Sequence, residues 1–233
     1  MDRDRLGNLS KLGNLERLGL WPARLVWLVT PLTIGPALAR ALEPKPATPA
    51  LAVEIALWSA WFAVLVAVLT PSPRSLTVCR IVAPGAIGAV VMAAVAEGWS
   101  GSVLLALGVG ALFTAAVFLP TFADRMINGS AYGSERRMAL RPQAFVLLGP
   151  VQVAWLLVFG GTVVPPLLIL DERYVLAGVA VVAGAAAVWA GGRILHQLSS
   201  RWVVFVPAGF VIRDPMTLVD AVLLRRNEVT AVG

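Results

Sequence analysis

Six stretches of this 233-residue chain are long and apolar enough to cross a lipid bilayer, and this feature limits the fold more than any other. A helix needs about 20 residues to cross a hydrocarbon core about 30 Å thick. Inside that core every backbone N–H and C=O group needs a partner within the protein, so apolar runs of this length fold as helices. The predicted spans are residues 24–41, 51–70, 77–96, 102–120, 144–169 and 175–197.

The composition points to the same class of protein. Hydrophobic residues make up 58% of the chain and charged residues 14%, and the mean hydropathy of +0.82 lies outside the range of soluble domains. The fold class we expect is therefore all-α integral membrane, a bundle of about six transmembrane helices with a short cytoplasmic β-rich tail. Its parts are a basic leader (1–23), the transmembrane domain (24–198) and the tail (199–233).

The distribution of basic residues predicts the orientation. Arg and Lys punctuate the apolar runs instead of forming a basic surface, so we expect the lipid bilayer and not nucleic acid as the partner. With both termini in the cytoplasm, sixteen basic residues lie inside and three lie outside, namely Arg40, Lys45 and Arg173. This asymmetry is typical of short loops in multi-pass proteins. The bias toward Arg, Ala, Val and Gly is typical of a high-GC bacterial genome, which predicts the bacterial plasma membrane.

The leader leaves one question of processing open. Residues 36–40 (PALAR) offer an Ala-x-Ala-like site for signal peptidase. The long leader before this site and the two prolines of the first span, Pro31 and Pro36, favour a helix that is not cleaved.

The tail is rich in β-branched and aromatic residues. Residues 201–215 (RWVVFVPAGFVIRDP) predict two strands around a Pro-Ala-Gly turn, and residues 222–232 could supply a third. These residues resemble the first strands of the PH-like modules that follow membrane helices in some bacterial proteins. The resemblance covers about 33 residues, which leaves two alternatives: the chain is a fragment of a longer protein, or the strands form a small unit beneath the helices.

The internal loop 121–143 holds most of the candidate functional residues. Planar guanidinium groups can bind phosphate bidentately, so four arginines predict contacts with a lipid headgroup or another phosphate: Arg125, Arg136, Arg137 and Arg141. The other polar candidates of the loop are Asp124, Asn128, Tyr132 and Glu135. The interpretation that we favour is orientation with nonspecific attraction to anionic lipids of the inner leaflet, and docking of a protein is a further alternative. Loop and tail together resemble a pattern in uncharacterised multi-pass membrane proteins of actinobacteria, a resemblance that implies no activity.

We also expect the loop and the tail to pack against each other. The tail aromatics Trp202, Phe205 and Phe210 require apolar cover. The loop can supply it from Met126, Ile127, Tyr132 and Met138.

Few ionisable residues fall within the spans. Glu54 is the membrane candidate, at the fourth residue of the predicted second span, where an interfacial position is favoured. Arg80 and Arg193 are expected to extend toward the inner interface. On the sixth span a small-residue face allows close helix packing, either within the chain or in a homo-oligomer. That face consists of Ala183, Gly184, Ala187 and Gly191.

No catalytic or metal-binding signature appears. One cysteine, Cys79, and one histidine, His196, cannot build a Cys/His metal site, so we expect no metal and no cofactor. The chain holds no GxSxG, P-loop or HExxH motif. These features favour a non-enzymatic scaffold or accessory protein of the bacterial envelope. The alternatives are a transporter of small molecules or ions, and an enzyme that acts on a lipid headgroup.

The topology is directly testable. Reporter fusions at residues 47, 99 and 172 should report the outside, and fusions at residues 74, 130 and 210 should report the cytoplasm, because the basic residues gather on that side. A cytoplasmic signal at residue 99 would contradict six spans with both termini inside.

Overall fold

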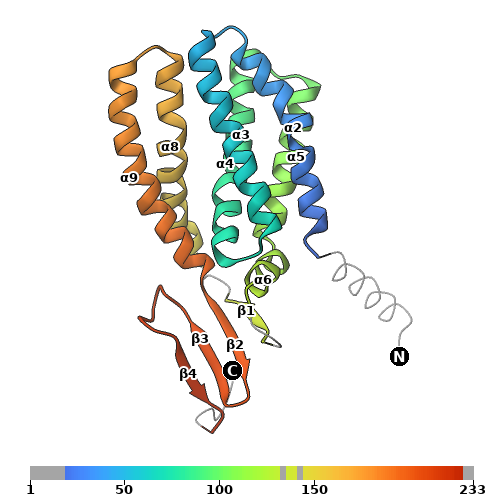
Figure 1. Cartoon of the computed structure of the whole chain (residues 1–233), viewed down its shortest axis with the longest axis vertical. Helices are drawn as coiled ribbons and strands as arrows, with labels where there is room; N and C mark the ends of the chain where they lie inside the picture. Colours follow the sequence, from blue (N-terminus) through green and yellow to red (C-terminus); the bar gives the residue numbers. More distant parts are fainter. Residues whose placement is uncertain (1–18, 132–134, 141–143, 228–233) are drawn as a thin grey trace, which may run out of the picture.

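The computed structural model describes residues 19–131, 135–140 and 144–227 and shows long helices side by side with a small sheet at one end (Figure 1). Six of the helices in this part of the chain are long and apolar enough to cross a membrane, which confirms the predicted fold class. They are α2 (Trp21–Leu42), α3 (Ala47–Leu69), α4 (Pro73–Glu97), α5 (Gly101–Phe118), α8 (Pro150–Leu170) and α9 (Tyr174–Ser199).

The fifth span differs from its predicted bounds. Residues 144–169 were expected to form one helix, but a short helix α7 (Ala144–Leu148) ends before Gly149, and α8 begins at Pro150. Gly149 has φ −114° and ψ −91°, which lies outside helical geometry, and the proline ring disfavours a helical residue before it. The apolar run therefore contains two helices, and only the second is long enough to span.

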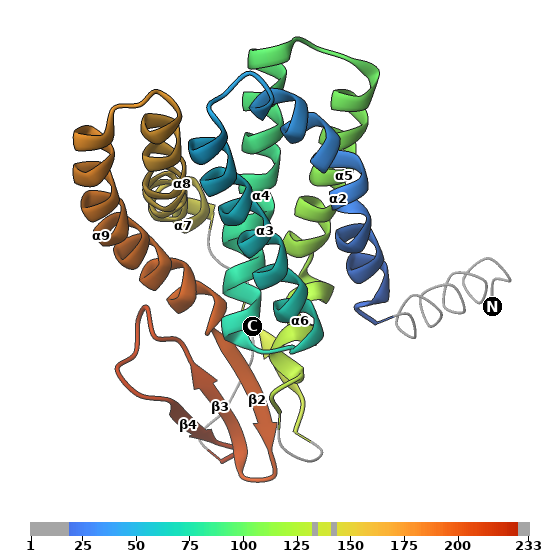
Figure 2. The ribbon, with the colours of Figure 1, turned by 45° about the horizontal axis from the view of Figure 1, so that its top comes forward.

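The helices form two groups. Helices α2 to α5 pack together around a core that includes Trp27, Leu76 and Phe113, while α8 and α9 form a hairpin beside α3 and α4 (Figures 1 and 2). The outer surface of both groups is also apolar; Leu32 and Val95, for example, are 77% and 72% exposed. Helix surfaces this apolar indicate that lipid surrounds them, because exposure of such a large apolar area to water is unfavourable.

The helical hydrogen bond that Pro31 removes from the first span is replaced by other donors, one of them from a neighbouring helix. Pro31 has no N–H, so the carbonyl of Trp27 loses its usual helical donor. The Thr30 hydroxyl donates to this carbonyl at 2.6 Å, and the Trp61 indole of α3 donates to it at 3.3 Å. The Trp27 indole in turn donates to the Trp61 carbonyl at 3.0 Å. These bonds satisfy the freed carbonyl and join α2 to α3 within the apolar bundle.

The small-residue face of α9 is partly covered by α8 and partly exposed. Gly184 lies so close to Gly161 of α8 that a Cβ on Gly184 would meet the Gly161 carbonyl oxygen at 2.4 Å, and Gly191 approaches Ala154 equally closely. Intramolecular packing therefore covers these two glycines, whereas Ala183 is exposed. Use of the exposed part in a homo-oligomer stays a prediction.

The loop after α5 contains a helix and a strand that the sequence analysis did not predict. Helix α6 (Pro120–Asn128) starts with proline at its first position, where the missing N–H costs nothing, and buries Phe122, Met126 and Ile127 against the core. The strand β1 (Arg137–Ala139) then pairs with the tail. The predicted packing of loop against tail is confirmed.

The described sheet is antiparallel, with order β1-β2-β3-β4. The predicted tail strands are confirmed as β2 (Trp202–Val206), β3 (Gly209–Arg213) and β4 (Val222–Arg225). Trp202 pairs with Ala139 on one side and with Arg213 on the other. The sheet lies at the same end of the molecule as α6 (Figures 1 and 2).

The expected cover for the tail aromatics is only partly correct. Trp202 packs against the core cluster that contains Met126 and Ile127. Phe205 is 63% exposed and contacts Phe210 instead, with ring centroids 6.2 Å apart. Because side chains alternate across a strand, Phe205 lies on the face opposite Trp202 and away from the helices. Met138 is exposed, and Tyr132 lies outside the described residues.

The close contact of α8 and α9 gives a stability test. In Gly184→Ala the new methyl group meets a backbone oxygen that cannot move alone, so we expect a loss of about 1–3 kcal/mol of stability. Gly178→Ala is the matched control on the same helix, because its Cβ would meet no atom within 4 Å. Thermal unfolding in detergent checks this, and equal melting temperatures for both variants would contradict the packing.

Candidate functional site: an arginine-rich junction

The helices and the sheet meet at a junction that holds several arginines. A small cavity of about 20 Å³ lies there between α4, α6, β1 and the end of α9. Arg80, Ser199 and Arg201 line it together with apolar side chains such as Ile127. A space of this volume holds about one water molecule, so the cavity in this form is not a pocket for an organic substrate.

Arg80 points into this cavity. Its Nη1 donates to the Ser199 hydroxyl at 3.4 Å, and its guanidinium carbon lies 5.8 Å from the centre of the Phe118 ring. The Nε atom is buried and bonds to none of the described residues. The side chain extends toward the ends of α5 and α9, where Phe118 and Ser199 contact it, and its reach to the inner interface stays a prediction. Arg193, in contrast, is exposed and lies 5.8 Å from the ring of Trp189.

Arg201 is neutralised by a buried carboxylate. Its Nη2 lies 2.7 Å from Asp214, with only 10% and 9% of the two side chains exposed. Burial by itself would raise the pKa of the Asp214 carboxyl. Hydrogen bonds from Arg201 and from the Met216 N–H at 3.2 Å, together with the Arg201 charge, hold that pKa below its ordinary value of 3.8. This pair fixes the connection after β3 against the start of β2.

Two of the predicted loop candidates have structural partners. The Asn128 amide donates to the Arg137 carbonyl at 2.6 Å and accepts from the Arg137 N–H at 2.8 Å, as a neighbouring strand would. Asp124 accepts from the Ala139 N–H at 2.8 Å. On the other edge of β1, Leu140 donates to the Arg201 carbonyl. The side chains of α6 thus cover the β1 edge that β2 leaves open, which protects it from pairing with another chain.

The predicted phosphate-binding arginines have different partners. Arg125 donates to the Gly19 carbonyl before α2, and Arg136 is exposed. Arg137 lies 4.9 Å from the Trp202 ring, 3.3 Å from the Ser130 hydroxyl and 3.8 Å from the exposed Glu135. Arg141, like Tyr132, lies outside the described residues.

The sequence analysis missed a pattern of arginines that lie over aromatic rings. Besides Arg80, Arg137 and Arg193, it includes Arg24 at 5.2 Å from the Trp21 ring and Arg213 at 6.0 Å from the Trp202 ring. The Trp21/Arg24 and Trp189/Arg193 pairs have helical i, i+3 and i, i+4 spacing, so the sequence could have indicated them. The contacts of Arg80 and Arg213 join separate elements and leave no such local signal.

Arg74 and Arg213 lie near His196 of α9, within electrostatic range of its ring. That ring contacts the Thr77 hydroxyl at 3.1 Å. Arg74 and Arg213 are themselves exposed. The junction therefore has enclosed arginines at its centre and exposed arginines around its rim.

Glu54 lies away from this junction. Helix α3 begins at Ala47, four residues earlier than predicted, so Glu54 is its eighth residue, and its side chain is exposed. At 1.5 Å per residue it lies about 10 Å along the helix from its start. An interfacial position for this carboxylate stays a prediction.

The carboxylates of the loop lie apart from both cavities of the described residues. Asp124 and Glu135 line neither the junction cavity nor the larger cavity at the opposite end of the bundle. Among the described residues, no group of three or more His, Cys, Asp or Glu could hold a metal ion.

Over the described residues, the fold is that of an integral membrane protein with six long apolar helices and a four-stranded sheet at one end. Comparison of the chain with protein-family models, with curated proteins and with solved structures finds no match.

The buried pair at the junction gives a pH-dependent prediction. Because the pKa of Asp214 is lowered in the folded protein, the pair stabilises the fold above pH 3.8, and this contribution is lost as the pH falls through the lowered value. Asp214→Asn should lose about 3 kcal/mol at pH 7, since Arg201 would stay buried without its counter-charge.

Thermal unfolding at pH 7 and at decreasing pH below 4 measures this effect. The difference between the wild type and Asp214→Asn should shrink as the pH falls. Asp220→Asn removes an exposed carboxylate from the same connection and serves as the control. A difference that stays constant down to pH 2 would show that the Asp214 charge does not stabilise the junction.

Proposed function

We propose that this protein is a non-enzymatic scaffold or accessory protein of the bacterial plasma membrane that binds anionic lipids of the inner leaflet through its arginine-rich junction. In this role the arginines attract and hold lipid phosphates, and the sheet presents a fixed surface next to the membrane. The proposal rests on the chemical nature of the groups that contact these arginines.

Several arginines at the sheet end of the molecule lie against neutral groups. Five of them lie over aromatic rings, which position a guanidinium group but leave its positive charge uncompensated. Of these five arginines, Arg137 alone pairs with a carboxylate of the described residues, the exposed Glu135, while the buried Arg201 pairs with Asp214. The remaining positive charge favours an anionic surface, at about 1 kcal/mol per basic residue.

The geometry of a guanidinium group favours phosphate as the ligand. Its planar fork of donors matches two oxygens of a phosphate, and Arg74, Arg136, Arg193 and Arg213 are exposed. Arg213 pairs in register with Trp202, three residues after the last residue of α9. A cation at this position is close to the level where a spanning helix leaves the hydrocarbon core, which is the level of the headgroups.

The placement of charge at the two ends supports a cytoplasmic position for the sheet. Arg24, Arg74 and Arg201 belong to the sheet end, whereas Arg40, Lys45 and Arg173 belong to the connections and helix ends on the other side. The positive-inside rule then favours contact between the junction and the inner leaflet.

The loop carboxylates favour a binding role over catalysis. Asp124 accepts a backbone hydrogen bond from β1, and Glu135 is exposed beside Arg137. A general acid or base must reach the group that it protonates or deprotonates, and a carboxylate engaged with the backbone is poorly placed for that task.

A lipid-binding measurement tests the proposal. We expect Arg136→Gln/Arg213→Gln to bind phosphatidylglycerol roughly thirtyfold more weakly, because two exposed charges worth about 1 kcal/mol each are removed. Native mass spectrometry of the protein with phosphatidylglycerol and with phosphatidylcholine measures the affinities, and titration with salt should weaken only the former.

The matched control is Lys45→Gln/Arg173→Gln, which removes the same charge from the opposite end. It should keep phosphatidylglycerol binding at the junction. Equal losses in both double variants would mean that net charge alone attracts the lipid, and the proposed binding site would then be wrong.

A further inference from the structure

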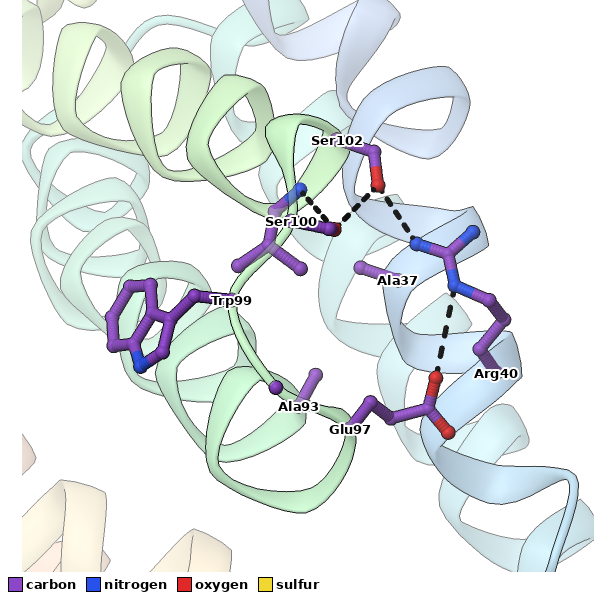
Figure 3. Close-up of a pocket in the computed structure, with 9 residues that line it drawn as sticks. Ala37, Arg40, Ala93, Glu97, Trp99, Ser100 and Ser102 are labelled. Carbon is purple, nitrogen blue, oxygen red and sulfur yellow. Dashed lines mark hydrogen bonds and ion pairs between the residues drawn. The ribbon is translucent and has the colours of Figure 1, made fainter.

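A second polar cavity lies at the end of the bundle opposite the sheet, between the ends of α2, α4 and α5 (Figure 3). Its volume is about 220 Å³, which is smaller than the pockets that hold drug-sized ligands. Arg40, Glu97, Trp99, Ser100 and Ser102 supply its larger side chains, and the small residues Ala37 and Ala93 keep its floor open. None of these residues belongs to the arginine-rich junction.

The cavity carries one positive and one negative side chain that are only loosely paired. Arg40 Nε lies 3.7 Å from a Glu97 oxygen, with 45% and 29% of the side chains exposed. That separation is too long for a strong hydrogen bond, and an exposed pair of this kind contributes little stability. The second interaction of Arg40 is a hydrogen bond from Nη2 to the Ser102 hydroxyl at 2.9 Å. Both charged groups therefore have hydrogen-bonding capacity left for a ligand.

The ends of α4 and α5 place partial charges of opposite sign at this cavity. Glu97 is the last residue of α4, where the free carbonyl groups favour a cation. Ser100 caps the first turn of α5, where free N–H groups favour an anion, and its hydroxyl lies 3.0 Å from that of Ser102. Gly98 has φ +90°, which glycine adopts without strain, and this turn brings the two helix ends together within three residues.

We propose that this cavity binds the headgroup of a phospholipid that carries a primary amine, such as phosphatidylethanolamine. The phosphate lies with Arg40, the serine hydroxyls and the start of α5, while the ammonium group lies with Glu97 and the end of α4. A zwitterion with one cation and one anion a few bonds apart fits both charges of the cavity at once. A ligand with only one charge would bind only one of the two charged side chains.

The surroundings favour a lipid over a soluble zwitterion. Trp99 borders the cavity and is 63% exposed, as is typical of tryptophan at a membrane interface. On α5, Leu105 lies one helical turn after Ser102 on the same side of the helix, is 59% exposed and provides apolar surface along which an acyl chain can lie. This site is independent of the proposed function, since it lies at the other end of the molecule and uses other residues.

Competition between lipids tests the site on the full chain. The purified protein is incubated with equal amounts of phosphatidylethanolamine and phosphatidylcholine, and the bound lipids are counted by native mass spectrometry. The wild type should retain the primary amine lipid preferentially, because a quaternary ammonium cannot donate a hydrogen bond to Glu97. In Glu97→Gln this preference should fall by roughly tenfold, the change expected for the loss of one charge-assisted hydrogen bond.

Controls separate the site from general effects of charge. Glu43→Gln removes an exposed carboxylate three residues after Arg40 without altering the cavity lining and should keep the preference. Thermal unfolding in phosphatidylcholine should be the same for both variants, because the lost ion pair is exposed. Arg40→Gln should weaken both lipids alike, whereas Lys45→Gln should weaken neither.

Three outcomes would overturn the proposal. The first is equal retention of both lipids by the wild type, and the second is the same preference in Glu97→Gln and Glu43→Gln. The third is saturable binding of soluble phosphoethanolamine without any preference between the lipids, which would assign the cavity to a free zwitterion. Phosphatidylglycerol binding at the junction is measured separately, so failure at one end leaves the other result standing.

Discussion

The need to pair every backbone polar group inside an apolar environment shapes this molecule from end to end. Among the described residues it produces six long helices whose outer surfaces are apolar. It also explains why Thr30 and Trp61 donate to the carbonyl that Pro31 leaves free. The same need applies at the sheet, where Asp124 and Asn128 satisfy the open edge of β1. Two polar side chains that the sequence offered as functional candidates thus bond to the backbone.

The junction is built on that framework. The α6 side chains hold β1, β1 holds β2, and Trp202 at the start of β2 packs on the core while it also contacts Arg137 and Arg213. This order of contacts places guanidinium groups beside the end of α9 without surrounding them with carboxylates. The opposite end has a different chemistry, because Arg40 and Glu97 provide both signs of charge in one cavity. The two proposals therefore assign lipids of different charge to the two ends.

The sequence predicted the helices and tail strands well because apolar runs and β-branched alternation are local patterns. It failed where contacts between distant segments decide. Helix α6 and strand β1 lie in a segment whose polar sequence is typical of a loop. They are recognised only from the core contacts of Met126 and from the pairing of β1 with β2. The contacts of Arg80 with Phe118 and Ser199 also join residues that are far apart in the chain. The cavity of Arg40 and Glu97 likewise joins three helix ends that no motif connects.

The central claim is that the exposed arginines of the junction contact lipid phosphates directly. Solid-state NMR can measure carbon–phosphorus proximity between arginine guanidinium carbons and lipid headgroups in phosphatidylglycerol bilayers. The account predicts that part of the guanidinium signal is attenuated by nearby phosphorus, in agreement with side chains such as Arg74, Arg193 and Arg213 at the headgroup level. A guanidinium signal that keeps its full intensity would place these arginines away from the phosphates and contradict the account.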